Sequence, residues 1–158
     1  VVISQYGHMF APRPAVVVKE LARVLKPGGI LAFSTWPKEL FMGKFFKLIE
    51  SFSQPLPLEV ASPVLWGDMA IIEDRLKDHF DHIEFARDTM FAPTMSPVHM
   101  LKLFEKNAGP LANLVKALAD DPTKLSNLRN AALVLIEKFF SNNFLRQDFL
   151  MTRCVKKT

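Results

Sequence analysis

The stretch Arg23-Val24-Leu25-Lys26-Pro27-Gly28-Gly29-Ile30-Leu31-Ala32-Phe33 decides the fold of this chain. A helix must end at Pro27-Gly28-Gly29, because proline cannot continue a helix and glycine readily adopts the left-handed conformation of a helix cap. The apolar residues from Ile30 to Thr35 then predict a strand. The stretch therefore predicts a helix, a tight turn and a strand in immediate succession.

The residues before this turn complete a βαβ unit. Val1–Ser4 is a short, largely β-branched run that predicts a buried parallel strand, and a loop follows as far as Pro12. Pro14 suits the first turn of a helix, whose apolar face comprises Val17, Val18, Leu21, Val24 and Leu25. A right-handed crossover should make the two strands parallel, and ligands of such folds bind where the strands end. The candidate site is therefore at residues 4–8 and 34–37.

The rest of the chain alternates helices with two further strands. Phe41, Phe45, Leu48, Ile49 and Phe52 form one helix stripe that ends at the proline-rich Gln54-Pro55-Leu56-Pro57. Asp68 is a plausible N-cap of the next helix, and residues 82–91 predict a strand.

Three helices should follow before the last strand. They begin at Ser96-Pro97, after Gly109-Pro110 and at Asp121-Pro122, and Asn142-Asn143 should close the last of them. Residues 144–155 predict the final strand, which precedes a basic tail.

Composition indicates a globular domain. Of the 158 residues, 49% are hydrophobic and 23% are charged, and no apolar run approaches the roughly 20 residues of a membrane helix. The absence of such a run predicts no membrane partner, and the lone Cys154, which cannot form an internal disulfide, fits the cytoplasm. The net charge of +4 is spread along the chain, which favours a solvated surface over a nucleic-acid footprint.

We expect no metal site, because the histidines are dispersed: His8, His79, His82 and His99.

The quoted stretch resembles the turn and following strand of class I S-adenosylmethionine-dependent methyltransferases, which commonly read leucine-lysine-proline-glycine-glycine before an apolar strand. The resemblance is closest to methyltransferase type 11 and the ubiquinone-biosynthesis-like members. Residues 147–153 also resemble the last, antiparallel strand of that family. The specific motifs lie within Val1–Pro37.

The resemblance implies an α/β, Rossmann-like methyltransferase fold, of which this chain would hold the C-terminal part. Its strands would be the fourth to the seventh, and the N-terminal cofactor half, with its glycine-rich loop and ribose-binding acid, would lie upstream of Val1. We expect one partial domain, with a core and following elements at 1–95, a helical substrate-side insert at 96–143, and the last strand with its tail at 144–158.

The resemblance also assigns candidate site residues. Ser4, Gln5 and Tyr6 match positions that approach the methionine part of S-adenosylmethionine, or they merely finish a strand. His8 is a candidate general base, because imidazole titrates near neutral pH, or it only orders the loop. Substrate contacts are expected from Met9, Phe10 and Trp36. Trp36 could also contact the sulfonium by a cation–π interaction, or simply pack against the helix of Phe41.

Two functions follow. The first is a methyltransferase that acts on a small-molecule acceptor. The second is a non-catalytic fragment that self-associates, because Val1–Ser4 would form an uncovered sheet edge that favours a homo-oligomer. A third class, nucleic-acid binding, has only the overall basic charge in its favour.

Overall fold

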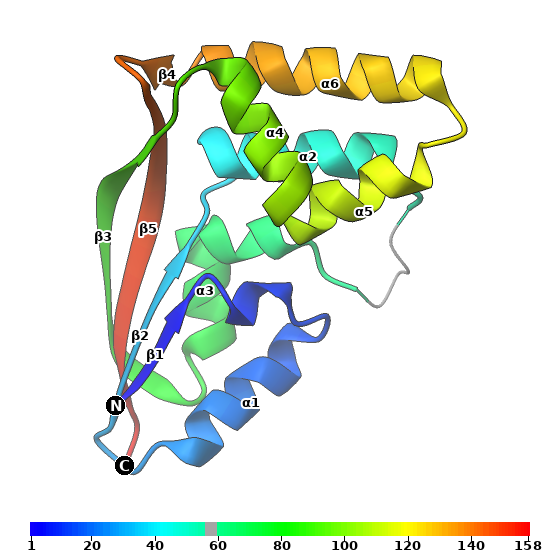
Figure 1. Cartoon of the computed structure of the whole chain (residues 1–158). Coiled ribbons are helices and arrows are strands. Elements are labelled where there is room, and N and C mark those ends of the chain that lie inside the picture. The colour runs from blue at the N-terminus through cyan, green and yellow to red at the C-terminus, as the bar shows by residue number, and fades with distance from the viewer. Residues whose placement is uncertain (56–59) are drawn as a thin grey trace. The chain divides into compact units, whose positions relative to one another are not determined.

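The computed structural model describes residues 1–55 and 60–158 and shows an α/β chain (Figure 1). Its sheet has the strand order β1-β2-β5-β3, with β1 at Val2–Gln5, β2 at Ile30–Thr35, β3 at Phe80–Pro93 and β5 at Phe144–Lys156. The predicted strands are therefore present, with β3 extending two residues further at each end. Leu56 and Pro57 of the proline-rich segment lie outside the described residues.

The βαβ unit forms as the sequence predicts. β1 pairs with β2 in parallel, from Val2 opposite Leu31 to Gln5 opposite Ser34. Helix α1 (Pro14–Val24) connects them, with proline in its first turn. At the turn, Gly28 has a φ of 73°, in the left-handed region that favours glycine.

The last strand is antiparallel, as the resemblance implies. β5 pairs with β2 from Val155 opposite Ile30 to Leu150 opposite Thr35. Lys156 also exchanges backbone hydrogen bonds with the glycine turn, at 3.0 Å to the Gly28 amide and 2.8 Å to the Gly29 carbonyl. The C-terminal strand therefore fixes the turn that defines the fold.

The two faces of the sheet differ in exposure near β1. Leu31, Phe33 and Cys154 are buried on one face, while Ile3 on the opposite face is 78% exposed. The expectation of a buried β1 strand is therefore wrong for one of its faces. The reason is that α1 lies against the other face of the sheet, so the face of Ile3 has no helix of the βαβ unit over it (Figure 1).

The chain divides into two compact units. Unit 1 comprises Val1–Leu40, Leu56–Asp88 and Asp148–Thr158, and unit 2 comprises Phe41–Pro55 and Thr89–Gln147. The sequence predicts that the Phe41 helix belongs with the core at residues 1–95, whereas in the structure this helix is part of unit 2.

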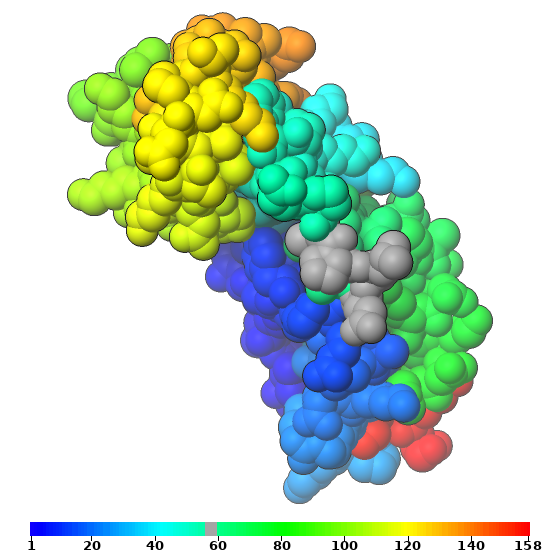
Figure 2. All heavy atoms as spheres, turned by 90° about the vertical axis from the view of Figure 1, so that its right-hand side faces the viewer, coloured from blue at the N-terminus to red at the C-terminus, as the bar shows by residue number. Residues whose placement is uncertain are grey.

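In unit 1, two helices lie on the same face of the sheet. α1 contacts α3 (Met69–Leu76), and Figure 2 shows them side by side, α1 in blue and α3 in green. Asp68 caps α3 as predicted, since its side chain accepts hydrogen bonds from the amides of Ala70 and Ile71. Short 3-10 turns at His8–Phe10 (η1) and Pro63–Gly67 (η2) contact each other and complete the unit.

Unit 2 is a helical cluster with an aromatic core. α2 (Phe41–Phe52) contacts α5 (Gly109–Ala117) and α6 (Pro122–Glu137), and α4 (Pro97–Asn107) contacts α5 and α6. The Phe45 and Phe104 rings lie 5.0 Å apart, and Phe41 meets Phe139 edge to face at 5.4 Å. These contacts explain why the phenylalanine stripe of α2 joins the predicted insert.

Asn142-Asn143 does not close a helix, contrary to the prediction. α6 ends at Glu137, and a short strand β4 (Phe140–Ser141) pairs antiparallel with the start of β5. Asn142 and Asn143 have φ values of 48° and 62°, so they form the tight turn of a β-hairpin. Asparagine tolerates this backbone conformation better than most residues, and such turns match the twist of paired strands.

Within residues 1–55 and 60–158, no helix combines the length and apolar character needed to cross a membrane.

Candidate active site

The candidate site lies where the parallel strands β1 and β2 end. Gln5 is the last residue of β1 and Thr35 the last of β2, so Tyr6 and Trp36 both follow at the same edge of the sheet. The Tyr6 amide donates a hydrogen bond of 3.2 Å to the Ser34 carbonyl. This bond extends the pairing of the strands by one residue and fixes the start of the loop.

Tyr6 and Trp36 form a stacked pair. Their ring centroids are 3.9 Å apart and their planes differ by 7°. Phe149 of β5 meets Tyr6 edge to face at 6.3 Å. Burial raises the pKa of Tyr6, although a hydrogen bond with the Ser34 side chain partly opposes this effect. The Tyr6 side chain is therefore a neutral phenol at physiological pH.

Ser4 holds His8 by two hydrogen bonds. The His8 amide donates to Ser4 Oγ at 3.2 Å, and Ser4 Oγ lies 2.9 Å from Nδ1 of the same histidine. Either the serine hydroxyl or the ring nitrogen can donate in this second bond, depending on the tautomer of His8.

His8 is enclosed by aromatic rings. Phe33 lies 4.5 Å and Trp66 4.7 Å from it between ring centroids, and both meet it edge to face. Nε2 is buried and has no hydrogen-bond partner among the described residues. Burial, and then the positive charge of Arg75, lower the pKa of His8 from 6.5 to about 4. His8 is therefore a neutral imidazole at pH 7 and a weaker base than a solvated histidine.

Two further residues, Trp66 and Arg75, complete this cluster. Trp66 is almost completely buried, and the Arg75 guanidinium lies over its ring, 4.5 Å from the centroid. The sequence shows Trp66-Gly67-Asp68 only as the start of a helix. Nothing local links these residues to His8, since they are 58 and 67 positions away in the chain.

The three predicted substrate contacts differ in accessibility. Met9 is 1% exposed and Trp36 is 5% exposed, whereas Phe10 is 46% exposed. Met9 therefore packs in the core of unit 1, where a substrate contact requires rearrangement. Phe10 is the most accessible of the three, and the roles of all three stay predictions.

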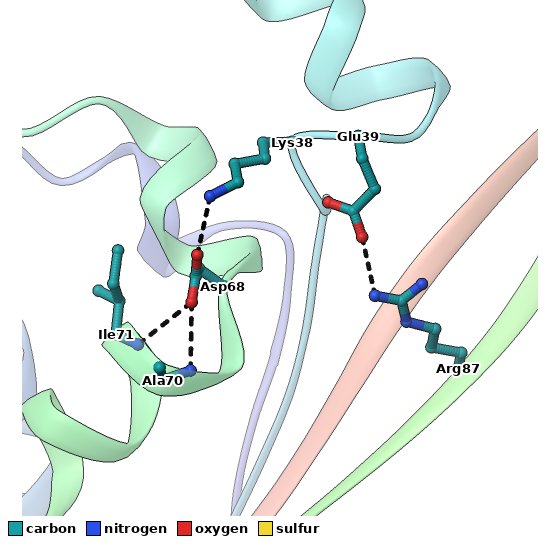
Figure 3. A network of polar contacts seen from close by, with 6 residues as sticks. All are labelled: Lys38, Glu39, Asp68, Ala70, Ile71 and Arg87. Atoms are coloured by element: carbon teal, nitrogen blue, oxygen red, sulfur yellow. Dashed lines mark hydrogen bonds and ion pairs between the residues drawn. The ribbon is translucent and has the colours of Figure 1, made fainter.

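A polar network fixes the loop that follows Trp36 (Figure 3). Lys38 Nζ donates to Asp68 Oδ2 at 2.9 Å, while the other carboxylate oxygen caps α3. In the same loop, Glu39 pairs with Arg87 of β3 at 2.8 Å. The hydrogen bond from Lys38 is the main cause that lowers the pKa of Asp68, which keeps this carboxylate charged. The network therefore attaches the loop after β2 to both α3 and β3.

Two hollows border these elements. An apolar groove of about 450 Å³ lies along α1, and His8, Val16, Val17 and Leu21 are among the residues that line it. A second hollow of about 660 Å³ lies over the charged network and includes Glu73 and Phe85. Among residues 1–55 and 60–158, no group of three or more histidine, cysteine, aspartate or glutamate side chains is placed to hold a metal ion.

Comparison with known proteins finds a similarity to a methyltransferase domain at the start of the chain. The model of the methyltransferase type 11 family, described as a methyltransferase domain, matches residues 1–33. This segment contains β1, α1, the glycine turn and most of β2. The match confirms the resemblance to this methyltransferase family for that segment of the chain.

Mycobacterial proteins are similar to this chain over nearly all of its residues. Two of them are uncharacterized proteins of Mycobacterium tuberculosis. Rv1403c is 27% identical over 95% of this chain, and Rv1405c is 26% identical over 99% of it. The chain spans about half the length of these relatives, 55% and 57% respectively.

Two solved structures also overlap with the chain. A protein from Bacillus halodurans (BH2331), provisionally described as a methyltransferase, has a TM-score of 0.48 at 14% identity and covers 99% of this chain and 64% of its own. The MccD protein has a TM-score of 0.46 at 11% identity, over 98% of this chain and 60% of its own.

Proposed function

We propose that this chain belongs to an S-adenosylmethionine-dependent methyltransferase that acts on a small-molecule acceptor. The observation that carries the proposal is the joint position of Ser4, Tyr6, His8 and Trp36 at the end of two parallel strands, within and beside the segment that matches a methyltransferase domain. We place the protein in the cytoplasm, since its lone cysteine is a buried, free thiol.

The residues present suit part of a cofactor site. S-adenosylmethionine supplies an activated methyl group, so the protein has mainly to position the reactants and exclude water. Gln5 is exposed at the end of β1 and offers an amide for polar contact. The stacked rings of Tyr6 and Trp36 offer a rigid apolar surface beside it. In this proposal Ser4 acts by orienting His8, because its hydroxyl is engaged with that residue.

His8 stays the candidate base, with a restricted range of acceptors. A pKa of about 4 keeps it unprotonated at neutral pH but reduces its driving force for removing a proton. We therefore expect an acceptor that needs little deprotonation, such as an already acidic hydroxyl or a nucleophile with a free lone pair.

Calorimetric titration of S-adenosylmethionine and S-adenosylhomocysteine into the chain tests this proposal. We expect weak binding, because the residues present form only part of the cofactor site, and Gln5→Ala should weaken it several-fold further through loss of the amide contact. Asn113→Ala removes another exposed amide, on α5, and should leave the affinity unchanged. Absence of binding by both ligands contradicts the proposal for this chain.

A specific observation favours self-association as the second candidate. β1 ends the strand order among the described residues, and Val1 and Ile3 are 82% and 78% exposed. An uncovered apolar strand tends to pair with another chain. We expect a dimer by light scattering at micromolar concentration, which Ile3→Lys disrupts and Val134→Lys, at an exposed position of α6, does not. A monomeric wild-type chain refutes this candidate.

A further inference from the structure

Unit 2 exposes a group of apolar side chains near the end of β3 and at the turn of the β4–β5 hairpin. Phe91, Met95 and Phe144 are 60%, 75% and 42% exposed. The rings of Phe91 and Phe144 meet edge to face at 6.3 Å, and Met95 and Phe144 line the same hollow of about 420 Å³. The three side chains therefore form one continuous surface, which we call the apolar tip. Continuous apolar surfaces of this kind mark contacts with proteins or membranes, whereas single exposed residues do not.

Hydrogen bonds hold the two segments of the apolar tip together. The Thr94 amide, in the turn after β3, donates a hydrogen bond of 2.9 Å to the Asn143 carbonyl of the hairpin. The Thr94 side chain is buried, and its Oγ1 lies 2.9 Å from Nδ1 of His99 on α4. The support of the apolar tip is therefore tied to the hairpin and to α4, and the tip is a fixed feature of unit 2.

The net charge of the chain belongs to the same unit. Unit 2 contains nine lysine and arginine residues and five aspartate and glutamate residues, so its net charge is +4. Unit 1 contains eleven of each kind and is neutral. Along the sequence these charges are dispersed, because unit 2 is assembled from two separate segments. The apolar tip is therefore carried by the positively charged part of the molecule.

Two lysines lie near the apolar tip along the chain. Lys102 follows the exposed Val98 by one helical turn, so the two side chains lie on the same face of α4. Lys138 is exposed at the end of α6, two residues before β4. Aromatic and aliphatic side chains flanked by positive charges are typical of protein surfaces that bind anionic bilayers. The apolar groups enter the headgroup boundary there, and the cations interact with the lipid phosphates.

We propose that the apolar tip of unit 2 docks on the surface of an anionic lipid bilayer. The contact requires no spanning helix, so it is compatible with the absence of a long apolar run, on which the expectation of no membrane partner rests. A second copy of unit 2 is a poorer partner for the tip, because it carries the same positive charge.

Co-sedimentation of the chain with phosphatidylcholine vesicles, with and without about 30% phosphatidylglycerol, tests the proposal. We expect much stronger binding to the anionic vesicles, and salt should weaken it because it screens exposed charges. Met95→Ser should reduce the partition coefficient about fivefold and Phe91→Ser about tenfold, because less apolar area enters the bilayer. Met69→Ser is the matched control, since it removes an exposed methionine from α3 of unit 1 and should leave the binding unchanged.

Three results would overturn the proposal. Binding to neither kind of vesicle contradicts it outright. Equal binding of Met95→Ser and the wild-type chain to anionic vesicles assigns the attraction to charge alone. Self-association of the wild-type chain that Met95→Ser abolishes, without vesicle binding, assigns the apolar tip to a contact between copies.

Urea unfolding of each variant separates these outcomes from a loss of folding. Phe91→Ser gives up a ring contact with Phe144, whereas Met95 is mostly exposed and its replacement should leave the free energy of unfolding unchanged. The Met95→Ser result therefore decides the proposal even if Phe91→Ser is unstable. None of these measurements involves the methyl donor, so they test the apolar tip independently of the proposed function.

Discussion

Acidification should destabilise unit 1 through His8. Burial and the charge of Arg75 lower its pKa from 6.5 to about 4 in the folded chain. Between these values the unfolded chain binds a proton that the folded chain does not, so stability falls as pH falls. One pKa unit corresponds to about 1.4 kcal/mol, so this residue alone should remove up to about 3 kcal/mol between pH 7 and pH 4.

The assay is urea unfolding of the wild-type chain and His8→Asn at pH 7, 6, 5 and 4. Asparagine does not titrate, and its amide oxygen can still accept a hydrogen bond from the Ser4 hydroxyl. The difference in free energy of unfolding between the two proteins should therefore shrink as pH falls. Its change with pH measures the contribution of His8 separately from that of the other titrating groups. An NMR titration of the His8 ring measures the same pKa directly.

A further variant tests the second cause of the shift. Arg75→Gln removes a positive charge near His8, so the pKa of His8 should rise and the dependence on pH should weaken. Parallel loss of stability with pH in the wild-type chain and His8→Asn would refute the reasoning, since it would mean that the imidazole is not held neutral by its surroundings.

Two further predictions concern the close packing of unit 1. Gly67→Ala should lower the free energy of unfolding by more than 1 kcal/mol, on the order of an overpacked core, because a Cβ there would collide with the Trp36 backbone. Gly109→Ala is the matched control, since a Cβ at that position meets nothing within 4 Å, and equal effects of both changes would contradict the packing argument. Cys154 should resist iodoacetamide at pH 8 until the chain is unfolded, because burial raises the pKa of its thiol to about 12; rapid alkylation of the native chain would show that the thiol is accessible.

The local sequence signals for helix ends and turns were sufficient to predict most of the helices and strands of the fold. Pro27-Gly28-Gly29 ends α1 and leads directly into β2, and Asp68 and Asp121 cap helices where their sequence positions predict. Asn142-Asn143 was misassigned because asparagine pairs suit both a helix end and a hairpin turn. The choice between them depends on whether the flanking residues find a strand partner, which Phe140 does opposite Leu145.

Part of the candidate site could also be located from the sequence. The carboxyl ends of two parallel strands must lie at one edge of a sheet, which is why Ser4, Tyr6, His8 and Trp36 could be grouped in advance. Trp66 and Arg75 could not be grouped with them, because they come from η2 and α3 and reach His8 only through packing. For the same reason, local sequence pattern could not predict their effect on the pKa of His8.

The sequence by itself determined the βαβ unit and the position of the last strand, because caps, turns and hydrophobic periodicity act over a few neighbouring residues. The antiparallel direction of the last strand was predicted only by the resemblance to the methyltransferase family, and the structure confirms it. Only the tertiary structure decided that α2 joins the helical unit, that Tyr6 stacks on Trp36, and that His8 is neutral. These features depend on contacts between side chains that are far apart in the sequence, and such contacts form only when the helices and strands pack together.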